Sequence, residues 1–134
     1  MKLSDFDFRI WDGKKYINNI KGGVYIHKIN DHIKCLNRSQ DCYDYEFELD
    51  DLDNSNLEIE LFTGFYDKNG KKIYEGDILE NKMTMEDLPY KVVFKWGVFY
   101  LVEIDGNDED LMSEFLFMEL EVIGNIHENA ELLK

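Results

Sequence analysis

The sequence predicts a mainly β fold, a small and curled antiparallel sheet or barrel with one short helix. Three observations lead to this prediction. Apolar and polar residues alternate in several short runs, which indicates strands with one buried face. Turn signals built on Gly, Asn and Asp separate these runs at short intervals, which is typical of antiparallel strands. The 134 residues contain one proline and no linker-like tract, so we expect a single domain.

The first half of the chain carries short strand patterns. Strands are expected at residues 6–11, 24–29, 33–37, 46–49 and 57–61. The first run alternates Phe6, Phe8 and Ile10 with charged residues, and Asp12-Gly13 marks the turn after it. Cys35 alternates with Ile33 on its strand, and we expect a buried free thiol there.

In residues 57–61, apolar residues alternate with Glu58 and Glu60, so the glutamates should face solvent.

The second half begins with a hairpin signal at residues 67–70, where Asn69-Gly70 suits positive φ. A returning strand at 73–80 is interrupted at Gly76-Asp77, which indicates a bend or bulge. Two paired strands are expected at 90–96 and 98–104 around Gly97, and a last strand at 121–127. The spacing of Leu111 and Met112 with the next apolar residues predicts a helix over 107–118. Asn129 should cap a final turn through residue 133.

Burial follows from these patterns. Eight residues are expected to be largely buried by alternation or by their position in the motifs described below: Leu57, Ile59, Leu61, Ile78, Val92, Phe94, Val122 and Ile126. A set of aromatic residues could form a base-stacking platform, but a small core needs large side chains, so we expect most of them inside: Trp11, Phe94, Trp96, Phe99 and Tyr100.

The charge limits the classes of partner. The formal net charge is −14, which opposes binding to nucleic acid phosphates and to anionic membranes. Residues 1–38 carry eight basic and four acidic groups, so a local positive face remains open. No run is long and apolar enough for a membrane span, and the N-terminus lacks the features of a signal peptide. We therefore expect a cytoplasmic protein.

No pattern indicates a metal site or a catalytic site. His27, His32, Cys35 and Cys42 lack the close pairs of a structural zinc site, so we expect no zinc and no other cofactor. No nucleophile elbow, P-loop or dinucleotide fingerprint is present. His127 beside Glu128 could act as an acid–base pair, but an exposed strand end is the simpler interpretation. We expect a protein that is not an enzyme.

Three segments carry a more specific signal. They are Phe8-Arg9-Ile10-Trp11-Asp12-Gly13, the run Thr-Gly-Phe-Tyr-Asp-Lys-Asn-Gly-Lys-Lys-Ile-Tyr-Glu-Gly-Asp-Ile at 63–78, and Glu-Val-Ile-Gly-Asn-Ile-His-Glu-Asn at 121–129. Together they resemble the YopX family of bacteriophage and prophage proteins. One departure is Ala130, where the family usually has Pro; the change affects only the stiffness of the last turn.

The resemblance implies an SH3-like barrel in residues 57–134, with additional N-terminal strands in a variable part at 1–56. It implies a phage or prophage origin and no particular reaction. The Gly-Asp bend at 76–77 is interpreted first as a structural bend that the fold requires. A binding role for Tyr74 or Glu75 is the alternative.

The leading functional hypothesis is an accessory protein that binds another protein, including a second copy of itself, because a compact β scaffold has edges that invite pairing. The alternative is an acidic DNA mimic that occupies a host DNA-binding protein. Its carboxylate rows would be Glu46 with Glu48 and Glu58 with Glu60, and residues 108–110 would add a third acidic cluster.

Overall fold

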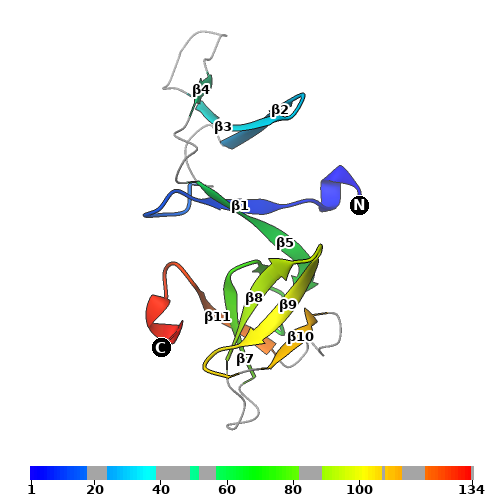
Figure 1. The fold of residues 1–134 in the computed structure, drawn as a ribbon, viewed down its shortest axis with the longest axis vertical. Coiled ribbons are helices and arrows are strands. Elements are labelled where there is room, and N and C mark those ends of the chain that lie inside the picture. The colour runs from blue at the N-terminus through cyan, green and yellow to red at the C-terminus, as the bar shows by residue number, and fades with distance from the viewer. Residues whose placement is uncertain are drawn as a thin grey trace. The chain divides into compact units, whose positions relative to one another are not determined.

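The computed structural model describes residues 1–17, 24–38, 49–51, 57–81, 89–106, 108–112 and 120–133 (Figure 1). The strands are β1 (Phe8–Trp11), β2 (Val24–Ile29), β3 (His32–Arg38), β4 (Leu49–Asp51), β5 (Glu58–Tyr66), β6 (Lys72–Tyr74), β7 (Asp77–Asn81), β8 (Tyr90–Lys95), β9 (Val98–Glu103), β10 (Glu109–Leu111) and β11 (Leu120–Asn125). Short 3-10 turns occur at η1 (Leu3–Asp5) and η5 (Ala130–Leu133). The prediction of a mainly β, antiparallel fold is confirmed.

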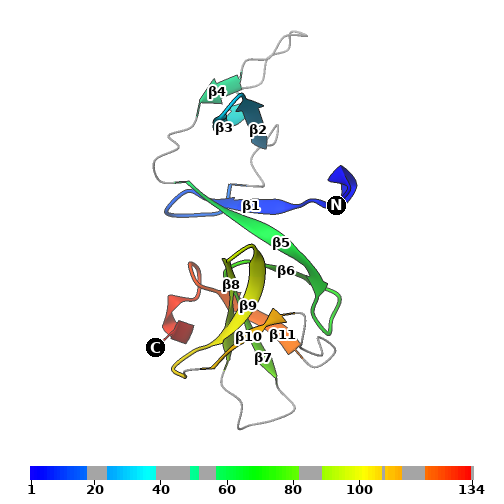
Figure 2. The ribbon, with the colours of Figure 1, turned by 45° about the vertical axis from the view of Figure 1, so that its right-hand side comes forward.

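The chain divides into two compact units, Arg9–Ile59 and the combination of Met1–Phe8 with Glu60–Lys134. In the first unit β3 lies between β2 and β4, and both pairings are antiparallel (Figure 2). Cys35 in β3 is buried as expected, whereas Ile33 is 65% exposed. Burial raises the pKa of the Cys35 thiol. The prediction of one domain, with a variable part at 1–56 and a barrel part at 57–134, stays a prediction.

The second unit is organised around a five-stranded antiparallel sheet with strand order β10-β9-β8-β7-β11 (Figure 1). Strands β7 to β10 follow one another as a meander, and β11 returns to pair with β7. A buried apolar cluster forms the core of this unit, and its members are Ile73, Leu79, Val92, Leu101, Met112 and Leu120. Burying each such side chain contributes roughly 1.5–3 kcal/mol.

The outer edge of β11 is covered by the turn that follows β5. The amide of Val122 donates to the Asp67 carboxylate at 3.0 Å, and the amide of Lys68 donates to the Leu120 carbonyl at 2.9 Å. These bonds use backbone groups that a further strand would need. Within the described ranges the sheets therefore stay open and do not close into the expected barrel.

The turn between β8 and β9 contains Trp96 and Gly97, whose φ angles are +56° and +79°. Positive φ at both central positions is the geometry of the tight hairpin turns that match strand twist. This placement leaves Trp96 86% exposed, and Phe94, which packs against Phe99 with ring centroids 4.8 Å apart, is 40% exposed. The expectation that these aromatic residues are core is wrong for Trp96 and Phe94, whereas Phe99 is half-buried.

The helix expected over 107–118 is not formed in its described part. Residues Glu109–Leu111 are β10 and pair with β9, with Glu109 opposite Val102 and Leu111 opposite Tyr100. Met112, the next residue, is buried in the core. Helix propensities differ by at most about 0.7 kcal/mol between ordinary residues, so strand pairing and the burial of one large side chain outweigh them. Residues 107 and 113–119 lie outside the described part.

The burial pattern expected in 57–61 is wrong at its centre. Glu60 is 4% exposed and Ile59 is 48% exposed, which is the reverse of the prediction. The reason is a polar partner inside the unit, because Nε2 of His127 lies 3.3 Å from Oε2 of Glu60. Gly76 leaves the space for this carboxylate, since a Cβ there would lie 2.5 Å from Glu60 Oε2.

The other burial expectations have mixed outcomes. Ile78 and Val92 are buried, as expected. Four residues are half-buried: Leu57, Leu61, Val122 and Ile126. At most of these positions the strands were located correctly, so the error concerns which face is buried.

Candidate functional site

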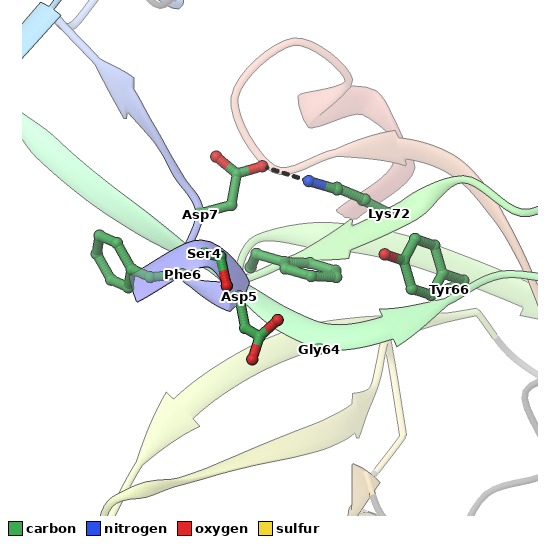
Figure 3. Close-up of a pocket in the computed structure, with 8 residues that line it drawn as sticks. Ser4, Asp5, Phe6, Asp7, Gly64, Tyr66 and Lys72 are labelled. Carbon is green, nitrogen blue, oxygen red and sulfur yellow. Dashed lines mark hydrogen bonds and ion pairs between the residues drawn. The ribbon is translucent and has the colours of Figure 1, made fainter. Parts of the chain in front are cut away.

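The best candidate for a binding site is a cleft between the N-terminal segment and the β5–β6 hairpin, with a volume of about 450 Å³ (Figure 3). It is lined by Ser4, Asp5, Phe6, Asp7, Phe62, Gly64, Tyr66 and Lys72. All of these residues belong to the unit that combines Met1–Phe8 with Glu60–Lys134, so one compact unit builds the whole cleft.

A local irregularity in β5 shapes the aromatic wall of the cleft. Phe62 pairs with Tyr74 and Tyr66 with Lys72, and the register shifts between these two pairs. Gly64 lies in the shifted stretch with φ +89°, a backbone angle that favours glycine. The rings of Phe62 and Tyr66 meet edge to face with centroids 5.5 Å apart. Edge-to-face packing is a favourable ring geometry, so the wall is preformed.

Asp7 holds the N-terminal segment against the hairpin. Its carboxylate accepts hydrogen bonds from the Lys72 ammonium at 2.9 Å and the Tyr74 hydroxyl at 2.5 Å. The amide of Phe62 donates to the Asp7 carbonyl at 3.0 Å. Burial raises the pKa of Asp7, but the bonds from Tyr74, Lys72 and the Phe8 amide outweigh that effect and hold the pKa below its ordinary value. The hydrogen bond to Asp7 raises the pKa of Lys72.

The cleft presents aromatic rings and carboxylates to solvent. Phe6 is 41% exposed and Tyr66 is 51% exposed. The Lys72 ammonium lies 4.9 Å from the centroid of the Phe62 ring, a cation–π distance. In Figure 3 the Asp5 carboxylate points away from the Asp7–Lys72 pair. The cleft therefore already holds one cation between a ring and a carboxylate, and it offers a second carboxylate elsewhere.

Of the two motif residues proposed for binding, Tyr74 bonds to a residue that lines this cleft, and neither lines the cleft itself. Tyr74 is half-buried, and its hydroxyl donates to the Asp7 carboxylate. Glu75 is half-buried, and its amide donates to the Leu61 carbonyl at 2.9 Å. The Gly-Asp bend beside them is structural, since Asp77 is buried and accepts the Tyr74 amide at 2.9 Å.

Of the two carboxylate rows expected on a solvent face, only the row of Glu58 and Glu60 lies in the described residues. Glu58 is exposed, but Glu60 is buried against His127. Glu46 and Glu48 lie outside the described residues. The row formed by Glu58 and Glu60 is therefore wrong as a binding surface, because its second member faces the inside of the fold.

The residues of the C-terminal motif form a turn that is held by hydrogen bonds among its own side chains and backbone amides. Oδ1 of Asn125 accepts the amides of His127 and Glu128, at 3.0 and 2.8 Å. Asn129 Oδ1 accepts the Asn125 amide at 3.1 Å, and its side chain occupies the space where Gly124 lacks a Cβ. Glu128 accepts a hydrogen bond from Nδ2 of Asn125. His127 is thus turned to Glu60 and not paired with Glu128 as an exposed acid–base couple.

In the described part of the chain, no three His, Cys, Asp or Glu side chains are placed to hold a metal ion. Cys42, one member of the weak zinc pattern, lies outside that part. No helix within the described ranges has the length and hydropathy that crossing a membrane requires. The absence of zinc stays a prediction.

Sequence reasoning missed the cleft residues. Gly64, Tyr66 and Lys72 all lie inside the central motif, which was the available signal. Phe6 carried only a strand pattern, and nothing local indicated that it approaches the hairpin. Their proximity depends on the Asp7 contacts, which join residues 65 and 67 positions apart in the chain.

Comparison with known protein families shows to which family the chain belongs. The family model described as YopX protein matches residues 7–134, which is nearly the whole chain. The chain belongs to the YopX family. The match includes every cleft residue except Ser4, Asp5 and Phe6. Comparison with curated proteins gives no match.

Two solved structures, each covered over nearly its whole length, share the fold. The crystal structure of protein yopX from Bacillus subtilis is similar with a TM-score of 0.65 and 21% sequence identity, covering 95% of this chain and 97% of that one. The crystal structure of protein EF1440 from Enterococcus faecalis has a TM-score of 0.63 and 26% identity, covering 96% of this chain and 98% of that one. Neither description names a reaction, ligand or partner.

Proposed function

We propose that this YopX protein is a non-enzymatic protein-binding module and that the aromatic cleft is where a segment of its partner docks. The observation that carries the proposal is a preformed cleft with exposed Phe6 and Tyr66 rings. Aromatic residues are enriched in protein interfaces because they bury much area while losing little conformational entropy. The Asp7 contacts hold the cleft in shape before any partner arrives, which lowers the cost of binding.

The sequence adds expectations about the activity, origin and fold relationship of this protein. The protein acts without catalysis or a cofactor, as the absence of catalytic motifs suggests. It serves a phage or prophage in the bacterial cytoplasm, and a second copy of the chain counts as one suitable partner. The part at 57–134 is related to SH3-like folds, with additional N-terminal strands before it, an idea supported by the meander of β7 to β10 with β11 returning beside β7.

The test places a photoreactive benzoylphenylalanine at position 66, where the exposed ring tolerates a larger substituent. After illumination in a bacterial lysate, a discrete crosslinked protein should appear. The same residue at position 96, another exposed aromatic position in the same unit, is the matched control and should not trap that protein. Crosslinks of equal yield from positions 66 and 96, or none from position 66, would reject the cleft as the docking site.

The DNA mimic is kept as a second candidate because Asp108, Glu109 and Asp110 are all exposed. The buried position of Glu60 weakens it. A mimic must compete with DNA for a basic protein and lose affinity steeply as salt rises. A trapped partner that binds DNA and is released from it by this protein would favour the mimic over the cleft model.

A further inference from the structure

We infer that the cleft receives an arginine side chain from a segment of the partner protein, with the guanidinium stacked on Tyr66 and paired with Asp5. This inference rests on the proposed function and names the chemistry that the same cleft recognises. It follows from three observations: the charge inside the cleft, the cation it already holds, and the exposure of its rings.

The charge of the cleft favours a cation. Two of its lining residues are carboxylates, Asp5 and Asp7, and the single ammonium of Lys72 is bonded to Asp7. An anionic group that entered the cleft would be repelled by the Asp5 carboxylate, because the basic lining residue, Lys72, is already bonded to Asp7. The whole chain carries −14, so its field attracts basic partners and repels acidic ones.

Lys72 shows how this site holds a cation. Its ammonium lies 4.9 Å from the Phe62 ring centroid and 2.9 Å from Asp7 Oδ2. An aromatic face and a carboxylate thus contact one positive charge at the surface, because Lys72 is exposed. Tyr66, half exposed, and Asp5, exposed, offer the same two kinds of group to a charge that comes from outside.

Arginine suits these groups better than lysine. Its guanidinium is planar, so it can stack on the Tyr66 ring while its N–H groups reach a carboxylate in the same plane. A lysine ammonium is a compact and strongly hydrated charge that cannot stack in this way. The partner segment should therefore carry arginine in an accessible stretch.

The experiment titrates the purified full chain with a blocked peptide that has one arginine among glycine and serine, and follows amide shifts by NMR. Shifts should concentrate at Asp5, Gly64, Tyr66 and Lys72. The same peptide with citrulline, which keeps the shape but not the charge, should bind at least several-fold more weakly. Tyr66→Leu should weaken arginine binding by roughly two- to fivefold, while Tyr66→Phe retains it. Asp5→Asn should weaken binding by roughly two- to fivefold and remove most of its dependence on salt.

Matched controls separate the cleft from the acidic surface in general. Trp96→Leu removes an exposed ring, and Asp110→Asn removes an exposed carboxylate, in both cases away from the cleft. Neither should change the affinity for the arginine peptide. Equal binding of arginine and citrulline peptides, or shifts that map away from the cleft, would overturn the inference. Binding of free agmatine as tight as that of the peptide would also overturn it, because the cleft would then take a small cation and not a protein segment.

The inference and the proposed function can fail separately. If position 66 crosslinks a protein and neither Asp5→Asn nor salt changes its capture, the docking site is supported and the proposed recognition of arginine is wrong. If the arginine peptide binds as described but position 66 traps no protein, the cleft recognises cations and the protein-binding module is wrong.

Discussion

The carboxylate of Asp67 accepts the amide hydrogen of Val122 at 3.0 Å, although the two residues lie 55 positions apart. The same carboxylate accepts the amides of Asn69 and Lys71, at 2.8 and 2.9 Å. One buried side chain thus closes the turn after β5 and protects the edge of β11. This contact joins the two motif segments at 63–78 and 121–129, which contain Asp67 and Val122.

Asp67→Asn should lower the free energy of unfolding by about 2–3 kcal/mol, because the amide group would bring an N–H donor against the Val122 amide. Urea unfolding followed by fluorescence measures the change. Asp110→Asn, on an exposed strand position, is the control and should change stability by less than about 0.5 kcal/mol. A loss no larger than that of the control would contradict the role given to Asp67.

The same residue should make stability depend on acid pH. Burial raises the pKa of Asp67, but the amides of Val122, Lys71 and Asn69 outweigh it and lower the pKa below its ordinary value. A lowered folded pKa gives stability that is fully present above the unfolded pKa, about 3.9, and is lost as pH falls through the folded pKa. The wild-type chain should therefore lose more stability than Asp67→Asn when the pH is lowered through this window. Parallel pH profiles for the two proteins would contradict the prediction.

Gly76→Ala should be much more harmful than Gly70→Ala. Both glycines have positive φ, +86° and +80°, so both substitutions carry a backbone cost of about 1–2 kcal/mol. At Gly76 the new Cβ would also lie 2.5 Å from Glu60 Oε2, whereas nothing lies within 4 Å at Gly70. Overpacking of this kind adds roughly 1–3 kcal/mol. Thermal unfolding of the two variants measures the difference, and equal losses would show that Glu60 does not fill the space below Gly76.

Ile78→Ala and Ile59→Ala test the corrected burial pattern. Ile78 is 0% exposed, so its truncation should lower the free energy of unfolding by about 2–5 kcal/mol. Ile59 is 48% exposed, and the same truncation there should cost less than about 1 kcal/mol. Chemical denaturation compares the two variants directly. A large loss at Ile59 would restore the original alternation, in which Ile59 faces the core and Glu60 the solvent.

Tyr74→Phe should raise the pKa of Asp7 toward its ordinary value, because it removes the hydroxyl that donates to the carboxylate at 2.5 Å. Lys72 and the Phe8 amide remain as donors, so part of the shift should persist. NMR titration of the Asp7 carboxyl carbon measures the pKa in both proteins. Tyr66→Phe removes a hydroxyl elsewhere in the cleft and should leave the Asp7 titration unchanged. A pKa that does not move in Tyr74→Phe would show that the hydroxyl does not bond to Asp7 in solution.

Local sequence determined the antiparallel β character, the places of most strands and the turns. These features depend on neighbouring residues: alternation marks a strand, and a glycine such as Gly97 between two strand patterns marks a turn. The motifs at 63–78 and 121–129 also identified the YopX family from sequence alone, and the family model confirms it. The bend at Gly76 was placed correctly because a positive φ is a local requirement that glycine meets best.

Tertiary structure alone decided which face of β5 is buried, the strand at Glu109–Leu111 and the existence of the cleft. Alternation separates two faces but does not say which is inside, and Glu60 is buried because His127 meets it there. The apolar spacing over 107–118 is helical, but the backbone of residues 109–111 finds partners on β9. Phe6 reaches the hairpin through Asp7, whose bonds to Lys72 and Tyr74 span more than 60 positions of chain. Each of these outcomes depends on groups distant in sequence, and no local pattern carries that information.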